Sequence, residues 1–368
     1  MQRVGAAPAL AAAGLIDRAA RVGVLPGAVL AAGRCGAEPL LLHVAGDAQH
    51  DAAATRPMAA DTVFDLASLT KVVATLPAVL HLVGRREISL DEPARRYLPA
   101  FTGPGKDQVT VRQLLLHTSG LPGQRRYDER PRDAAKARAA ALAEPLVARP
   151  GAVVCYSDVG FIALGELAAA VAGCGLDELV RDVVCAPLGM TTTRFLPPPT
   201  WAGRIAATEN VCGIAKVGVV HDENAAVLGG VAGHAGLFGT AADLGRYAAA
   251  WAGDGSPPGG LRAEALRCQT EGLGGRRGLG WGVRGDAWDN MGDGWPASGA
   301  GHTGFVGTSL SVDPRSGLWA VLLTNAVHFG RSPGPRNPVV GLRKQVHAAV
   351  ATALLGPAGQ RAGQPEDR

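Results

Sequence analysis

The sequence predicts an α+β fold in which an antiparallel sheet is flanked by terminal helices and a mainly helical region is inserted between the strands. Three observations support this prediction. Strand-like apolar runs occur near both ends of the chain, helical patterns lie between them, and amphipathic helical patterns precede the first strand and follow the last. The chain has 368 residues, of which 47% are hydrophobic and 18% charged, so it can form a sizeable core and is not a wholly disordered protein.

The N-terminal segment is predicted to form a helix followed by a hairpin. Leu10, Ile16 and Val24 belong to an amphipathic pattern that leads into the first strand. Apolar runs at residues 27–32 and 39–44, separated by a glycine-containing turn, predict two antiparallel strands. A third short extended element is expected at residues 62–66.

The middle of the chain is predicted to be helical. Residues 68–83 lack strand alternation and end at Gly84, a helix stop signal, and Pro77 is expected to kink or shorten this helix. Further helices are expected at residues 111–117, 132–142, 160–172, 176–184 and 243–251.

Strand patterns return near the C-terminus, at residues 279–283, 308–312 and 318–324, and a final amphipathic helix is expected over 338–354. We therefore assign residues 1–66 and 252–355 to an α/β sheet domain and residues 67–251 to a mainly helical domain. The small and polar residues 356–368 are predicted to form a disordered tail.

Composition excludes several classes of protein. The net charge of +4 is small and scattered, which gives no footprint for nucleic acid, and no apolar run has the length of a membrane span. The six cysteines are widely spaced and are expected to be free thiols. The alanine-rich N-terminus lacks the apolar centre of a signal peptide, so we expect a cytoplasmic protein, with a secreted or periplasmic location as the alternative. The oligomeric state is left open.

The first chemically informative motif is Ser68-Leu-Thr-Lys71, at the predicted start of a helix. Residues three apart share a helix face, so the Ser68 hydroxyl and the Lys71 amine can meet. A serine needs a base to become a nucleophile, and a lysine can serve only if its pKa is lowered. The chain has only five lysines, and chance would give roughly 0.14 such matches. The alternative is a helix-start serine beside a solvated lysine.

The second motif is Tyr156-Ser-Asp158, in a loop directly before a predicted helix. A phenol near an ammonium group can act as a proton shuttle. Asp158 is also a candidate N-cap for the helix that follows.

The third motif is Gly301-His-Thr-Gly304, directly before a strand expected to begin at Phe305. Flanking glycines allow a ligand to approach the backbone at a sheet edge, where an N–H group can serve as an oxyanion donor. Taken alone, this motif is better explained as a surface turn.

In their order and separation, the three motifs resemble those of the penicillin-recognising serine enzymes, whose signature is S-x-x-K, S-D-N and K-T-G. The chain is most similar to the branch of class C β-lactamases, D-alanyl-D-alanine carboxypeptidases and related esterases, where the second motif is Tyr-x-Asn and the third can be His-Thr-Gly. Further segments resemble that family, and the likeness extends over residues 25–350: 64–71, 88–93, 111–121, 187–190, 235–238 and 322–325. The resemblance implies the β-lactamase/transpeptidase-like fold.

The resemblance also implies roles for individual residues. Ser68 would be the acylated nucleophile, Lys71 its activating partner and Tyr156 the proton relay. The N–H groups of Ser68 and Phe305 would form the oxyanion hole. The remaining substrate-binding candidates are Asp158, His302, Thr303 and Gly304. No cofactor and no metal is implied.

Two residues depart from the family pattern. Asp158 replaces the usual asparagine, and an ionised carboxylate can accept but not donate a hydrogen bond. Asp158 is therefore a poorer partner for a substrate carbonyl, and its charge would keep Lys71 protonated. His302 replaces the lysine of dedicated β-lactamases, and a neutral imidazole is a poorer anchor for a substrate carboxylate.

These features predict a serine hydrolase that cleaves an amide or ester of a small molecule or peptide through an acyl-enzyme. A peptide ending in D-alanine or a muropeptide fragment is the first substrate candidate, a small ester the second and a β-lactam the third. The alternatives are a catalytically silent sensor with the same fold and a metal hydrolase built on His221, Asp222 and His234.

Overall fold

The computed structural model describes residues 6–52, 54–129, 133–253, 261–331 and 338–359, and it confirms the predicted α+β fold class. A seven-stranded sheet has the order β3-β2-β1-β12-β11-β10-β9, and all of its pairings are antiparallel. Its strands are β1 (Gly27–Arg34), β2 (Leu41–His50), β3 (Thr55–Pro57), β9 (Gly282–Val283), β10 (Ala300–Thr303), β11 (Ser309–Asp313) and β12 (Leu318–Thr324). Strand β1, from the N-terminal part of the chain, pairs with β12, from the C-terminal part.

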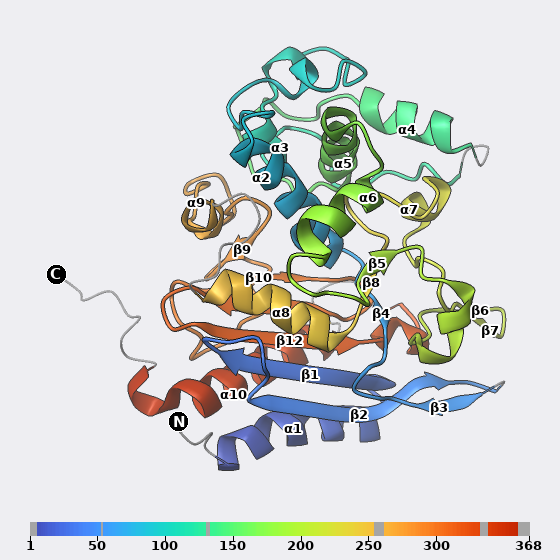
Figure 1. Cartoon of the computed structure of the whole chain (residues 1–368), viewed down its shortest axis with the longest axis vertical. Coiled ribbons are helices and arrows are strands. Elements are labelled where there is room, and N and C mark those ends of the chain that lie inside the picture. Colours follow the sequence, from blue (N-terminus) through green and yellow to red (C-terminus); the bar gives the residue numbers. More distant parts are fainter. Residues whose placement is uncertain (1–5, 53, 130–132, 254–260, 332–337, 360–368) are drawn as a thin grey trace.

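Helices cover both faces of this sheet (Figure 1). Helices α1 (Ala6–Arg21) and α10 (Pro338–Gly359) lie on one face, and α8 (Ala241–Ala252) lies on the other. Because side chains alternate along a strand, Ala320 and Leu322 of β12 join the core beneath α1 and α10, whereas Trp319 and Val321 join the core that contains α8. The central strands are therefore buried on both sides.

A mainly helical region lies beyond α8 and is centred on α5 (Asp158–Ala172) (Figure 1). Phe161, Leu164 and Leu167 of α5 are fully buried. The helices of this region and its borders are α2 (Leu76–Gly84), α3 (Val111–Leu115), α4 (Ala134–Ala143), α6 (Leu176–Val180), α7 (Glu223–Val227) and α9 (Arg262–Leu266). Two small sheets complete the fold, one of β4 (Phe64–Asp65), β8 (Leu237–Gly239) and β5 (Arg194–Phe195), the other of β6 (Asn210–Val211) and β7 (Ile214–Ala215).

Several predicted boundaries are wrong. The strand expected at 279–283 is only β9. The strand predicted at 308–312 is β11, but the longer strand predicted from Phe305 is wrong, because residues 304–308 form a turn. The third motif consequently lies largely within β10. Helix α10 continues to Gly359, past a kink at Gly356, into the tail expected over 356–368; residues 360–368 lie outside the described residues.

Pro77 was predicted to kink or shorten the helix over 68–83. In the structure, a π-helical turn, Lys71–Thr75, directly precedes α2, and Pro77 lies in the first turn of α2. In this turn the Leu76 N–H donates to the Lys71 carbonyl. To continue the same pattern, the N–H of residue 77 would have to donate to the Val72 carbonyl. Pro77 has no N–H group. The buried Tyr247 hydroxyl donates to the Val72 carbonyl instead, and this contact ties α8 to the helix that carries Lys71.

All six cysteines are free thiols, as predicted. Within the described ranges, no single helix has both the length and the apolar composition to cross a membrane; one bent pair, Asp158–Ala172 with Leu176–Cys185, meets both criteria jointly.

Candidate active site

Ser68 lies at a strained junction between β4 and the helix that carries Lys71. The preceding residue, Ala67, has a φ of 46°, in the left-handed region that residues other than glycine rarely adopt. The buried Asp65 carboxylate accepts the Ala67 N–H at 2.7 Å and the His221 N–H at 2.7 Å. Asp65 thus fixes the backbone from which Ser68 projects. Its side-chain role depends on these tertiary contacts, and no sequence signal indicated it.

Lys71 is fully buried, and its ammonium group has acceptors from three segments. Its Nζ lies 2.9 Å from Ser68 Oγ, 3.0 Å from the His234 carbonyl oxygen and 2.7 Å from Asp158 Oδ1. Burial alone would lower the pKa of Lys71, but the Asp158 carboxylate and the Tyr156 phenol outweigh it, so the pKa lies above its usual range. Lys71 therefore approaches Ser68 as a charged donor.

Tyr156 lies against the His117 ring and close to two cations, Lys71 and Arg277. The His117 carbonyl accepts the Cys155 N–H at 2.8 Å, and His117 Nδ1 accepts the Ser157 N–H at 3.0 Å, so both neighbours of Tyr156 are fixed. The His117 ring centroid lies 4.6 Å from that of Tyr156. Lys71 Nζ and Arg277 Cζ lie 5.0 Å and 5.8 Å from the centre of the phenol ring. Positive charge beside the ring stabilises negative charge on the phenol during proton transfer.

Asp158 is not the N-cap of α5, contrary to the suggestion from sequence. Ser157 fills that position, because its Oγ accepts the Gly160 N–H at 3.0 Å. Asp158 is the first residue of the helix, where the helix dipole favours a carboxylate. Its side chain is thereby available to pair with Lys71.

The third motif lies beside an open stretch of sheet edge. Strand β9 pairs only with Ala300 and Gly301, so β10 has no β9 partner at His302 or Thr303. Burial, together with the charges of Lys71 and Arg277, holds the pKa of His302 well below its usual range, and this imidazole is neutral. Its ring centroid lies 5.9 Å from that of Tyr156.

Gly304 brings this motif next to Ser68. A Cβ atom there would lie 2.6 Å from the Leu66 carbonyl oxygen and 2.2 Å from Thr308 Oγ1, so only glycine allows this approach. Neither the Ser68 N–H nor the Phe305 N–H donates a hydrogen bond to any of the described residues. Both amides remain available for a substrate oxygen. The Phe305 ring is 55% exposed and stacks on His221, with the ring centroids 5.7 Å apart.

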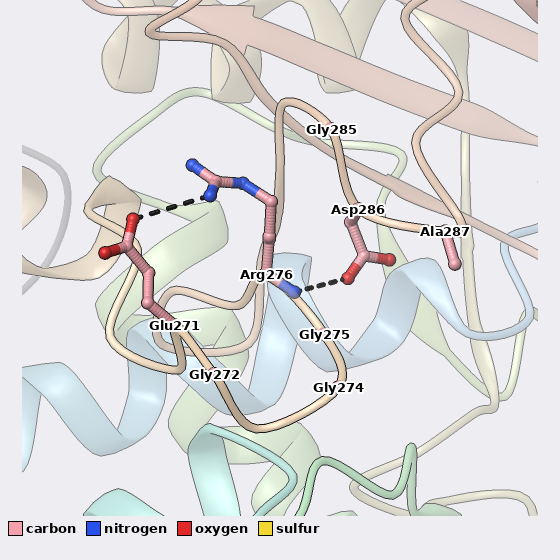
Figure 2. Close-up of a pocket in the computed structure, with 8 residues that line it drawn as sticks. All are labelled: Glu271, Gly272, Gly274, Gly275, Arg276, Gly285, Asp286 and Ala287. Atoms are coloured by element: carbon pink, nitrogen blue, oxygen red, sulfur yellow. Dashed lines mark hydrogen bonds and ion pairs between the residues drawn. The ribbon is translucent and has the colours of Figure 1, made fainter.

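Arg277 belongs to the site, although the sequence did not indicate it. Its buried guanidinium donates to Asp286 Oδ1 at 3.0 Å. A pocket of about 580 Å³ adjoins this pair, but Ser68, Lys71 and Tyr156 do not line it. Asp286, on the pocket wall (Figure 2), also accepts the Arg276 N–H, at 2.8 Å. Asp286 therefore holds the segment that presents Arg277 to Tyr156.

Of the three residues of the metal-hydrolase alternative, two pair with each other and the third faces a different carboxylate. Asp222 Oδ1 lies 2.9 Å from His234 Nε2, whereas His221 Nε2 faces Glu209 Oε2 at 3.3 Å. In the described part of the chain, no three histidine, cysteine or acidic side chains are arranged to hold an ion.

Known proteins resemble the chain over most of its length. The family model named Beta-lactamase matches residues 13–344. A relative from Escherichia coli K12, named "Putative D-alanyl-D-alanine carboxypeptidase", is 31% identical over 313 residues, which cover 75% of this chain and 72% of that protein. A solved beta-lactamase from Mycobacterium bovis has a TM-score of 0.61 at 26% identity, covering 90% of this chain and 97% of that one. EstCE1, described as a hydrolase with promiscuous acyltransferase activity, shares the fold with a TM-score of 0.73 at 24% identity, covering 92% and 98%.

The Lys71–Asp158 ion pair generates a first prediction. Asp158→Asn should lower the free energy of unfolding by about 3 kcal/mol, because it removes the charged partner of a buried ammonium. It should also lower the pKa of Lys71, so that Ser68 reacts faster with a fluorophosphonate at neutral pH. Denaturant titration and labelling rates measure the two effects. Asp182→Asn, at an exposed ion pair, is the control. Slower labelling of a fully folded Asp158→Asn variant would contradict this role.

Asp65 generates a prediction about pH. Burial raises the pKa of Asp65 to about 6, against its hydrogen bonds from His221 and Ala67. The folded protein therefore binds this proton more tightly than the unfolded chain, and the associated stability is full below about pH 4 and lost as pH rises through about 6. Only the ionised carboxylate accepts both N–H groups fully, so activity should instead rise with pH through about 6.

Asp65→Asn should remove both pH dependences. The measurements are kcat/KM and the free energy of unfolding between pH 4 and 8. An acid limb near pH 6 that persists unchanged in Asp65→Asn would assign the titration to another group.

Proposed function

The chain belongs to the Beta-lactamase family of serine hydrolases, and from this premise we propose that it cleaves an amide or ester through an acyl-enzyme on Ser68. The observation that supports this most directly is the contact of Ser68 Oγ with Lys71 Nζ at 2.9 Å, next to two amides that have no acceptor among the described residues. Such amides can bind the oxygen that becomes negatively charged when a carbonyl is attacked.

The proposed reaction has two steps. The Ser68 oxygen attacks the carbonyl carbon, an Oγ–C bond forms, and the bond to the leaving group breaks. Lys71 already donates to Ser68 Oγ and to the His234 carbonyl and is ion-paired with Asp158, so it holds the Ser68 oxygen in place. Tyr156 relays the serine proton to the leaving group. Water then attacks the acyl carbon, its proton returns to Ser68 by way of Tyr156, and the free acid leaves.

A peptide ending in D-alanine is the first candidate substrate. Its support comes from relatives that are 31% identical and carry the name of a D-alanyl-D-alanine carboxypeptidase.

A small ester is the second candidate, and one observation about the site favours it. His302 is neutral, and Asp158 is an acceptor already paired with Lys71. The third motif therefore supplies no ammonium group for a substrate carboxylate, and Asp158 supplies no donor for a substrate amide. An uncharged ester needs neither group, and a β-lactam carboxylate would miss the same cation.

Labelling of Ser68 tests the proposed chemistry. A fluorophosphonate should give a single adduct on Ser68, detected by mass spectrometry of the digested protein, because the serine is held beside the unoccupied amides. Ser68→Ala should give none. Tyr156→Phe should lower turnover by about 10²-fold, the usual scale for acid–base groups. Lys71→Ala should also lower turnover, because the Ser68 oxygen loses the donor that positions it. Retained turnover in Ser68→Ala would show that another residue is the nucleophile.

Matched substrates separate the alternatives. Release of D-alanine from an N-acyl-D-alanyl-D-alanine peptide supports the first candidate, and turnover confined to an aryl ester of the same acyl group supports the second. A stable penicillin adduct on Ser68 without turnover of any donor would favour the silent sensor.

A further inference from the structure

Arg343 is a buried cation that the proposed reaction has not used. It lies in α10 with only 8% of its surface exposed. None of the ion pairs among the described residues involves Arg343, and burial lowers its pKa to about 10, so it stays charged at neutral pH. Burying a charge without a carboxylate partner is costly. The contacts of Arg343 should therefore explain why this charge is buried.

Both described contacts of the guanidinium are with the turn that follows the third motif. Arg343 Nη2 donates to the Gly304 carbonyl oxygen at 2.6 Å, and Nε donates to the Gly307 carbonyl oxygen at 3.0 Å. The Gly304 carbonyl and the Phe305 N–H belong to one planar peptide group. A positive donor on that oxygen draws electron density from the peptide nitrogen and makes the Phe305 N–H a stronger donor.

The surrounding contacts keep this peptide in one orientation. The Gly304 N–H donates to the Thr308 carbonyl oxygen at 2.8 Å, and the Gly307 N–H donates to the Gly304 carbonyl oxygen at 3.1 Å. Arg343 joins the two ends of the turn from outside. Helix α10 is itself tied to β11, where His347 Nε2 lies 3.1 Å from Ser309 Oγ.

We propose that Arg343 is a positioning residue of the oxyanion site, which orients and polarises the Gly304–Phe305 peptide so that its N–H binds the developing negative oxygen more strongly. This inference rests on the proposed function, because it takes Ser68 as the nucleophile and Phe305 as an oxyanion donor. It connects α10, which lies on the face of the sheet opposite α8 (Figure 1), to the reacting carbonyl.

The effect should appear in the transition state rather than in substrate binding. Removal of a whole oxyanion donor costs about 10²–10³-fold in kcat. Arg343→Met leaves the Phe305 N–H present but unpolarised and less firmly oriented, so we expect kcat to fall by roughly 10-fold with little change in KM.

The test compares three substitutions that keep an unbranched side-chain stem. Arg343→Met removes charge and donors, Arg343→Gln keeps an N–H donor without charge, and Arg343→Lys keeps the charge with a single donating group. Lys344→Gln changes an exposed cation next to Arg343 and is the control, for which no effect is expected. Steady-state kinetics with an aryl ester give kcat and KM for each protein.

Infrared difference spectroscopy supplies the readout that a purely structural role would not move. The aryl ester carries ¹³C at its carbonyl, so the acyl-enzyme on Ser68 has an isolated C=O band whose frequency falls as its hydrogen bonds strengthen. The band should lie lowest in the wild type and in Lys344→Gln, slightly higher in Arg343→Lys, higher again in Arg343→Gln and highest in Arg343→Met.

Two results would overturn the inference. An unshifted band in folded Arg343→Met, whatever its kcat, would reduce Arg343 to a structural residue. If Arg343→Met does not fold, identical bands in Arg343→Gln, Arg343→Lys and the wild type would do the same. Absence of any acyl band in the wild type would instead refute the proposed function, and the inference with it.

Discussion

The structure of the site depends on the burial of one ammonium group. Lys71 has no contact with solvent, and its charge is tolerated because Ser68, the His234 carbonyl and the Asp158 carboxylate surround it. These acceptors come from the start of the helix after β4, from the loop before β8 and from the first residue of α5. The contacts that satisfy the charge of Lys71 therefore bring the first and second sequence motifs together. The third motif joins them through Gly304, which lies against the backbone of Leu66.

The placement of positive charge distinguishes this site from the motif pattern of the family that the sequence resembles. The third motif contributes a neutral histidine, while Arg277 and Arg343 bring positive charge from segments outside the motifs. Arg277 is paired with Asp286 and lies against the Tyr156 ring. Arg343 lies behind the Gly304–Phe305 peptide. Positive charge thus reaches the Tyr156 phenol and the proposed oxyanion site from the protein interior, whereas His302, at the open edge of β10, is neutral.

Features that depend on local residue spacing could be predicted from the sequence. Features that depend on contacts between residues far apart in the chain could not. Ser68 and Lys71 are three residues apart on a helix, and the period-2 and helical patterns sufficed for the fold class. The strand start predicted at Phe305 was wrong, because only the tertiary contacts of Gly304 show that residues 304–308 turn. Asp158 was considered as a cap although Ser157 serves, since both residue types suit that position. Asp65, Arg277 and Arg343 were missed, because each acts on a partner distant in sequence.

Direct titration of Lys71 tests the central claim that this ammonium group stays charged. The chain has only five lysines, so ¹³Cε-lysine labelling gives few NMR signals, and Lys71→Arg identifies the relevant one. Burial lowers the pKa of Lys106 to about 8, which provides an internal reference for a lysine that titrates early. The account predicts that Lys71 keeps its proton at a pH where Lys106 has lost its own. Loss of the Lys71 proton near neutral pH would make it a free base and contradict the account.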